Sequence, residues 1–270
     1  MGSGKNAAEN KPKSIDFNGG SGIIKVRNTD IQNDLLGGKE NLWSKIKSKL
    51  ASSSGAKITK ADAEAALLDI GFERVDKSFY SKVDPKLQVA VIEQLTKLES
   101  RFNVLKKSVS PYITADAVGD SIAFARYDMN QPAIQSLHLS KTKFKNAKTH
   151  IRERKSELAK NHCMPCEIDN DTLSKYVVTH EYGHMLSSVL AHERMQGTIW
   201  TRQQLINSYK NQIIDIAKRI DNNFTIEKYL SNYGFKNDDE FFAECFANSQ
   251  LGNPNVLGTA MEIWLKKEGY

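Results

Sequence analysis

Residues 172–190 combine two properties that restrict how the chain can fold: apolar side chains on nearly all sides of a helix, and two histidines four residues apart. The first property predicts a helix that is buried on most of its surface. Side chains at positions i and i+4 lie one above the other on a helix. His180 and His184 can therefore direct their ring nitrogens at one point inside the protein. We expect Asp171 or Thr172 to cap this helix.

The sequence His180-Glu181-Tyr182-Gly183-His184 has the HExxH pattern, in which two histidines bind one zinc ion. Glu181 cannot reach the same ligand position, but it can hydrogen-bond a water in the cleft and take its proton. HExxH occurs by chance in roughly one chain in a hundred of this length, so two core histidines without a metal remain an alternative. A third ligand separates these interpretations, because a catalytic zinc takes three protein ligands and keeps one position open.

The best candidate for a third ligand lies on a later predicted helix, at 238–249. Glu240 and Glu244 share one face of it, among Phe and Ala residues. Carboxylates in such surroundings need partners. We expect Glu240 to bind the ion and Glu244 to accept the remaining N–H of a ligand histidine. The compact pattern HExxHxxGxxH fails, because Ser187 and Leu190 stand where Gly and His are required.

Together with Ser231-Asn232-Tyr233-Gly234 and Glu240-Phe241-Phe242-Ala243-Glu244, the HExxH segment resembles the catalytic domain of anthrax toxin lethal factor and its relatives, which include the Pro-Pro endopeptidases. The likeness covers mainly residues 172–250. It implies a gluzincin in which Zn²⁺ is bound by His180, His184 and Glu240. It further implies that Glu181 is the general base, that Glu244 supports the ligands, and that the Tyr233 hydroxyl stabilises the transition state. Tyr233 also has a structural explanation, since an aromatic residue before Gly often packs under a turn.

The function implied is that of a zinc-dependent endopeptidase, which hydrolyses peptide bonds of a protein or peptide substrate through a metal-activated water. Substrate would bind extended along the edge of a small sheet, at residues 121–127 or 134–140. His138 is expected to be an ordinary strand residue. Two alternatives stay open: a non-catalytic zinc-containing module of a phage particle or other larger assembly, and a zinc enzyme that hydrolyses an amide of a non-protein substrate.

The fold class expected is mostly helical α+β, a zincin-like arrangement of a small sheet, the HExxH helix and a third-ligand helix packed across it. Two short antiparallel strands should flank a turn at 128–132. Helical periodicity predicts further helices at 149–160, 201–219 and 254–267. Composition and pattern divide the chain into a flexible leading segment or linker at 1–38, a helical subdomain at 39–115 and a zincin-like catalytic region at 116–270.

The basic excess of the chain is confined to its N-terminal segment. Residues 1–60 hold 11 Lys/Arg and 5 Asp/Glu, whereas the rest holds 27 of each. A dispersed lysine-rich tail is usually a solvated linker, so nucleic-acid binding is not favoured.

Within the N-terminal segment, Asn18-Gly19-Gly20-Ser21-Gly22-Ile23-Ile24 is similar to tails of prophage minor head proteins. The similarity implies that the chain could be part of a larger phage or toxin polypeptide.

The sequence has no run of about 18 apolar residues and no secretory signal, so no membrane span is predicted. Localisation is left open, because the sequence is compatible with a secreted and with a virion-associated protein.

Cys163-Met-Pro-Cys166 beside His162 resembles half of a structural zinc site, but two further ligands are missing. We expect a loop with two free thiols or one local disulfide there.

Overall fold

The structure is a computed structural model of the 270-residue chain, and it describes residues 42–52, 57–119, 121–127, 134–161 and 169–270. All of these lie in the second of two units, 1–39 and 40–270, into which the contacts divide the chain. The predicted leading segment, the turn at 128–132, and His162, Cys163 and Cys166 lie outside the described residues.

The expected mostly helical α+β architecture with a small sheet is confirmed. The helices are α1 (Leu42–Ser52), α2 (Lys60–Asp69), α3 (Lys77–Lys82), α4 (Pro85–Phe102), α5 (Ala147–Asn161), α6 (Asn170–Met195), α7 (Arg202–Ile220), α8 (Asp238–Gln250) and α9 (Val256–Lys267). The strands are β1 (Arg74–Val75), β2 (Val109–Ala117), β3 (Ala123–Tyr127) and β4 (Ile134–Ser140), with short 3₁₀ helices at Leu105–Lys107 and Ile226–Lys228.

Helix α6 contains the HExxH sequence and begins at Asn170. Its N-cap is Asp169, whose carboxylate accepts the Thr172 N–H at 2.7 Å. The prediction of Asp171 or Thr172 as the cap is therefore wrong, because several residues with good capping side chains follow one another here and the first of them begins the helix. As predicted, most residues of α6 are buried.

The C-terminal end of α6 extends five residues beyond the predicted 190, to Met195. The charged residues of this last turn are held by ion pairs: Glu193 with Lys107 at 2.9 Å, and Arg194 with Glu268. These ion pairs stabilise the helix beyond residue 190, where the apolar pattern that predicted it ends.

The sheet has the strand order β1-β2-β4-β3. The antiparallel pairing of β3 with β4 confirms the two predicted strands, while β1 and β2 extend the sheet by parallel pairing. Strand β3 is therefore an edge strand. Strand β2 contains the predicted boundary at 115/116, and the division into a helical subdomain and a catalytic region stays a prediction.

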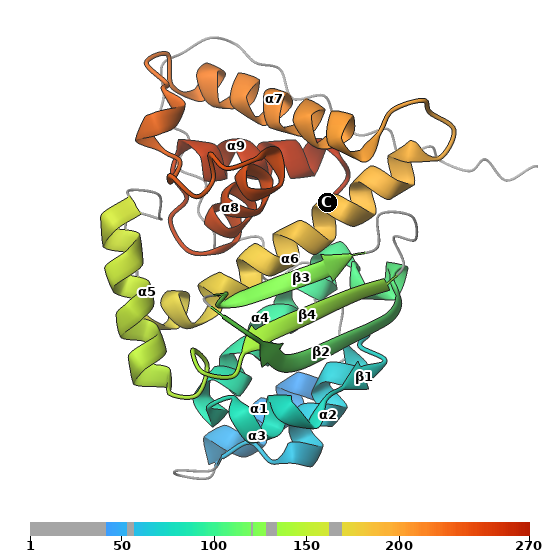
Figure 1. Ribbon diagram of the computed structural model, residues 1–270, viewed down its shortest axis with the longest axis vertical. Helices are drawn as coiled ribbons and strands as arrows, with labels where there is room; N and C mark the ends of the chain where they lie inside the picture. The colour runs from blue at the N-terminus through green and yellow to red at the C-terminus, as the bar shows by residue number, and fades with distance from the viewer. Residues whose placement is uncertain (1–41, 53–56, 120, 128–133, 162–168) are drawn as a thin grey trace, which may run out of the picture. The chain divides into compact units, whose positions relative to one another are not determined.

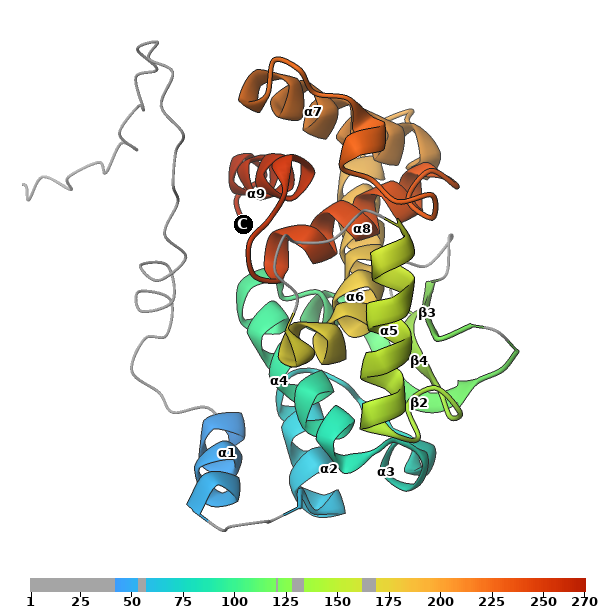
Figure 2. The same cartoon turned by 90° about the vertical axis from the view of Figure 1, so that its left-hand side faces the viewer.

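The two faces of the sheet differ in what covers them. Helices α4 and α6 lie against one face (Figures 1 and 2), where Leu137 and Leu139 are fully buried. Alternation along β4 directs His138 to the opposite face. There its ring stacks on Phe124 and lies 2.6 Å from Asp116 Oδ1. His138 is thus a strand residue, as expected, on the face away from the HExxH helix.

Helix α8 approaches α6 very closely at Gly183. A Cβ atom at this position would lie 2.9 Å from the Cα of Ala243 and 3.2 Å from Cδ1 of Phe246. Real Cβ atoms do not come so close to backbone atoms, so only glycine permits this crossing of the two helices. The sequence analysis did not single out Gly183 for this role. Helices α7 and α9 pack against α8 in turn.

We expect Gly183→Ala to destabilise the protein by about 1–2 kcal/mol, because overpacking in a filled core outweighs the better helix propensity of alanine. The displacement of α8 should also weaken binding of a divalent metal, since α8 carries Glu240. Urea unfolding in the presence of a chelator measures the packing effect alone, and a metal titration measures the second. Wild-type stability under chelation would contradict the close-packing argument.

Candidate metal centre

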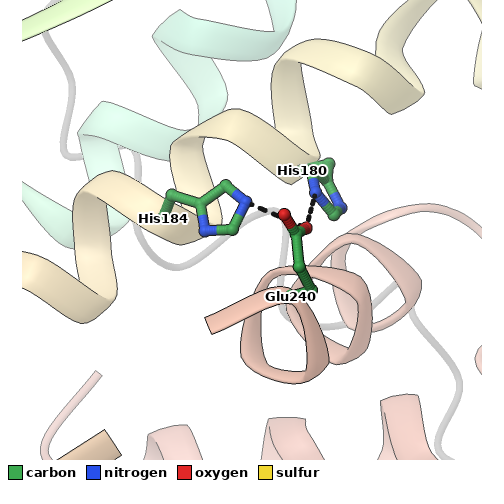
Figure 3. Close-up of side chains that lie close together, drawn as sticks. All are labelled: His180, His184 and Glu240. Carbon is green, nitrogen blue, oxygen red and sulfur yellow. Dashed lines mark hydrogen bonds and ion pairs between the residues drawn. The ribbon is translucent and has the colours of Figure 1, made fainter. Parts of the chain in front are cut away.

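Three potential metal ligands come together between α6 and α8. The carboxylate oxygen Oε2 of Glu240 lies 3.0 Å from Nε2 of His180 and 3.3 Å from Nε2 of His184. One ligand atom from each residue lies within 4.8 Å of the other two. Figure 3 shows the two rings on successive turns of α6, both beside the Glu240 carboxylate. This group could hold a metal ion.

The start of α8 fixes the position of Glu240. Asn237 is the N-cap of this helix, and its side-chain oxygen accepts the backbone N–H of Glu240 at 2.9 Å. Glu240 therefore lies in the first turn, where a negative charge is favoured by the helix dipole. Its side chain is 15% exposed, and the side chains of His180 and His184 are similarly covered.

The group fits a zinc ion. Two ligand atoms about 2.0–2.1 Å from a tetrahedral zinc are roughly 3.3 Å apart, close to both separations measured from Glu240 Oε2. Two imidazoles and one carboxylate are a ligand set that zinc accepts while keeping a position open. Nδ1 of His180 is buried and has no hydrogen-bond partner within the described part of the chain. That nitrogen would carry the proton if Nε2 bound a metal.

Without a metal, the same residues form an ion-paired cluster. Burial alone would raise the pKa of Glu240, but the hydrogen bonds from His180 and His184 outweigh it and hold this pKa far below its usual range. For His180, burial would lower the pKa, and the contact with Glu240 and the charges of Glu181 and Glu244 raise it by more. The carboxylate of Glu240 is therefore ionised and available as a ligand.

Glu181 belongs to α6 and is buried where this helix meets the edge strand β3. Its side-chain oxygen Oε2 accepts the backbone N–H of Ala125 in β3 at 2.8 Å, and the residue is only 7% exposed. Of the two segments expected to line the cleft, 121–127 and 134–140, the first therefore directly contacts Glu181. The sequence analysis identified Glu181 but not its partner, because the donor is a main-chain group.

Tyr233 lies near His180, in the turn that follows Ser231. Its ring centroid is 6.0 Å from that of His180, and the residue is 45% exposed. Burial, followed by the negative charges of Glu240 and Glu181, raises the pKa of its hydroxyl above the usual value. Tyr233 therefore keeps its proton at neutral pH and can act as a hydrogen-bond donor.

Glu244 contacts the turn at Ser231, which the sequence analysis did not anticipate. Its carboxylate accepts the backbone N–H of Ser231 at 2.8 Å and also the Ser231 hydroxyl. The same hydroxyl oxygen accepts the N–H groups of Tyr233 and Gly234, each at 3.0 Å. Glu244 thus holds the turn that carries Tyr233. A contact between Glu244 and a ligand histidine stays a prediction.

Comparisons of the chain with protein-family models, with curated proteins and with solved structures found no match. The function is therefore inferred from the site itself. None of the described helices is long and apolar enough to cross a membrane.

Proposed function

We propose that the protein is a zinc-dependent endopeptidase of the gluzincin type, which hydrolyses peptide bonds of a protein or peptide substrate. His180, His184 and Glu240 would hold the ion, Glu181 would be the general base, and Tyr233 would stabilise the transition state. The observation that carries the proposal is the convergence of the three ligand atoms beside a buried carboxylate that is itself fixed to an edge strand.

Bound in this site, a zinc ion would polarise the substrate carbonyl and lower the pKa of a water. Glu181 takes the proton of the attacking water and returns it to the leaving amine. The Tyr233 hydroxyl, which keeps its proton, donates a hydrogen bond to the oxygen that becomes negative when the carbonyl is attacked. One such donor contributes roughly 3 kcal/mol to transition-state stability.

The substrate would bind as an extended chain along the edge of β3 that no other described strand covers. An edge strand presents unpaired N–H and C=O groups that an added strand can use. Because Glu181 contacts the middle of β3, a peptide bound there would place a main-chain carbonyl near the general base. This arrangement supports a peptide substrate over an amide in a compact non-protein molecule.

Metal content and cleavage, measured on the same purified protein, test the proposal. We expect elemental mass spectrometry to find about one zinc per chain. Digestion of a proteome-derived peptide library should produce new peptide termini. A chelator should abolish the cleavage, and added zinc should restore it. Zinc without cleavage would favour the non-catalytic module of a larger assembly, and a protein that binds no zinc would contradict the proposal outright.

A further inference from the structure

We propose that the backbone N–H of Ala125 is a positioning group for Glu181. It anchors the oxygen Oε2, so that the other oxygen, Oε1, is the one that takes and returns the proton. This inference rests on the proposed function of Glu181 as general base. The contact that carries it, from Ala125 N to Glu181 Oε2 at 2.8 Å, joins the edge of the sheet to the HExxH helix.

The pairing of β3 with β4 leaves the Ala125 N–H free for this role. Ser140 N donates to Ile122 O at 2.8 Å, which makes residues 122 and 140 a hydrogen-bonded pair. In an antiparallel ladder such pairs alternate with pairs that are not hydrogen-bonded. The register Phe124↔His138 and Ala125↔Leu137 therefore turns the N–H of Phe124 toward β4 and that of Ala125 toward the free edge.

A backbone donor suits this role better than a side chain would. The strand holds the Ala125 N–H in place through its ladder with β4, so the donor cannot rotate away from Glu181. Hydrogen bonds to an ionised carboxylate are among the stronger ones in proteins. With one oxygen fixed, the carboxylate of Glu181 has a defined orientation, and the unanchored oxygen is left as its basic site.

The anchor also affects how a substrate can pair with β3. A peptide added to this edge finds the Ala125 N–H already occupied by Glu181. It must form its hydrogen bonds with other groups of the strand and leave this one in place. The edge would thus bind the substrate and orient the general base through different backbone groups.

Amide exchange tests the anchor without any measurement of activity. In metal-free protein, Glu181→Ala removes the acceptor, so the Ala125 amide should exchange its hydrogen with solvent roughly 10- to 100-fold faster than in wild type. The amide of Phe124, which points into the ladder, serves as the internal control and should change little. An unchanged Ala125 exchange rate would overturn the anchor.

Kinetics test its role in turnover. Proline is tolerated on an edge strand where the N–H points away from the ladder, so Ala125→Pro removes the donor and leaves the ladder in place. We expect its kcat to fall roughly 10- to 100-fold with zinc content unchanged. Ala123→Pro is the matched control, since the ladder also turns the Ala123 N–H away from β4, and among the described residues the backbone donor to Glu181 is Ala125 and not Ala123. The KM of Ala123→Pro can change, because the substrate binds at this edge, but its kcat should fall far less than that of Ala125→Pro.

The outcomes separate this inference from the proposed function. Equal kcat values in the two proline variants would overturn the positioning role of Ala125. If Ala125→Pro does not fold, the exchange measurement decides. A wild-type protein that binds zinc and cleaves no peptide would contradict the proposed function, and accelerated Ala125 exchange in Glu181→Ala would then still establish the contact.

Discussion

Glu181→Gln is expected to lower peptide cleavage by roughly 10²- to 10⁴-fold while the protein keeps its zinc. Glutamine has the same shape as glutamate, and its amide oxygen can still accept the Ala125 N–H that holds Glu181 in place. No ligand atom of the metal group is altered. The variant therefore loses one property, the ability to take up a proton at neutral pH. The measurement is kcat/KM on a cleaved peptide, with zinc content determined on the same sample.

Glu193→Gln is a suitable control, because it makes the same chemical change on the same helix. The Glu193 side chain is 45% exposed and pairs with Lys107 at 2.9 Å. A surface ion pair of this kind contributes about 0–1 kcal/mol, so stability and cleavage should both stay near wild type. Full activity in Glu181→Gln would remove Glu181 from the mechanism. If Glu181→Gln instead lost its zinc, the roles assigned to the site residues would be wrong, while the requirement for the metal would stand.

The features that the sequence could predict are those that depend on one segment at a time. The buried HExxH helix, the β3–β4 pair and the apolar helix that carries Glu240 each have a local pattern, and the structure contains all three. The convergence of His180, His184 and Glu240 could also be expected. Histidines four residues apart already define a point in space, and a carboxylate in apolar surroundings needs a partner.

The features that could not be predicted depend on contacts between segments. Gly183 permits α8 to cross α6, but nothing in its neighbours shows that another helix passes there. Glu244 holds the turn at Ser231, a contact that the sequence did not indicate. The sequence indicates that the buried Glu244 carboxylate needs a hydrogen-bond donor, but it does not indicate which donor lies beside it.

The partner of Glu181 illustrates the same limit more strongly. The Ala125 N–H is a group that every residue except proline carries, so no choice of side chain marks it. Only the strand order, with β3 at the edge, and the phase of its ladder reveal that this N–H faces the helix. Main-chain contributions to a site of this kind become visible with the tertiary structure.

Glu240→Ala should lower zinc affinity by more than about 100-fold, the upper range for loss of a residue that only supports a ligand. The change removes Oε2 of Glu240, which lies within 3.3 Å of both histidine Nε2 atoms. Two imidazoles alone are a poor zinc site, because a catalytic zinc takes three protein ligands. Competition with a fluorescent zinc chelator measures the affinity directly. Cleavage should be lost in parallel at limiting zinc.

Asp238→Ala provides the control for this change. It also removes an acidic residue from the first turn of α8, so both variants lose the same favourable interaction with the helix dipole. The Asp238 carboxylate contacts Lys210 Nζ at 2.8 Å and not the histidines. Zinc affinity close to wild type is expected for Asp238→Ala. Equal affinities of both variants and wild type would exclude Glu240 as a ligand, and the cluster would then be an ion pair between α6 and α8 that stabilises their packing.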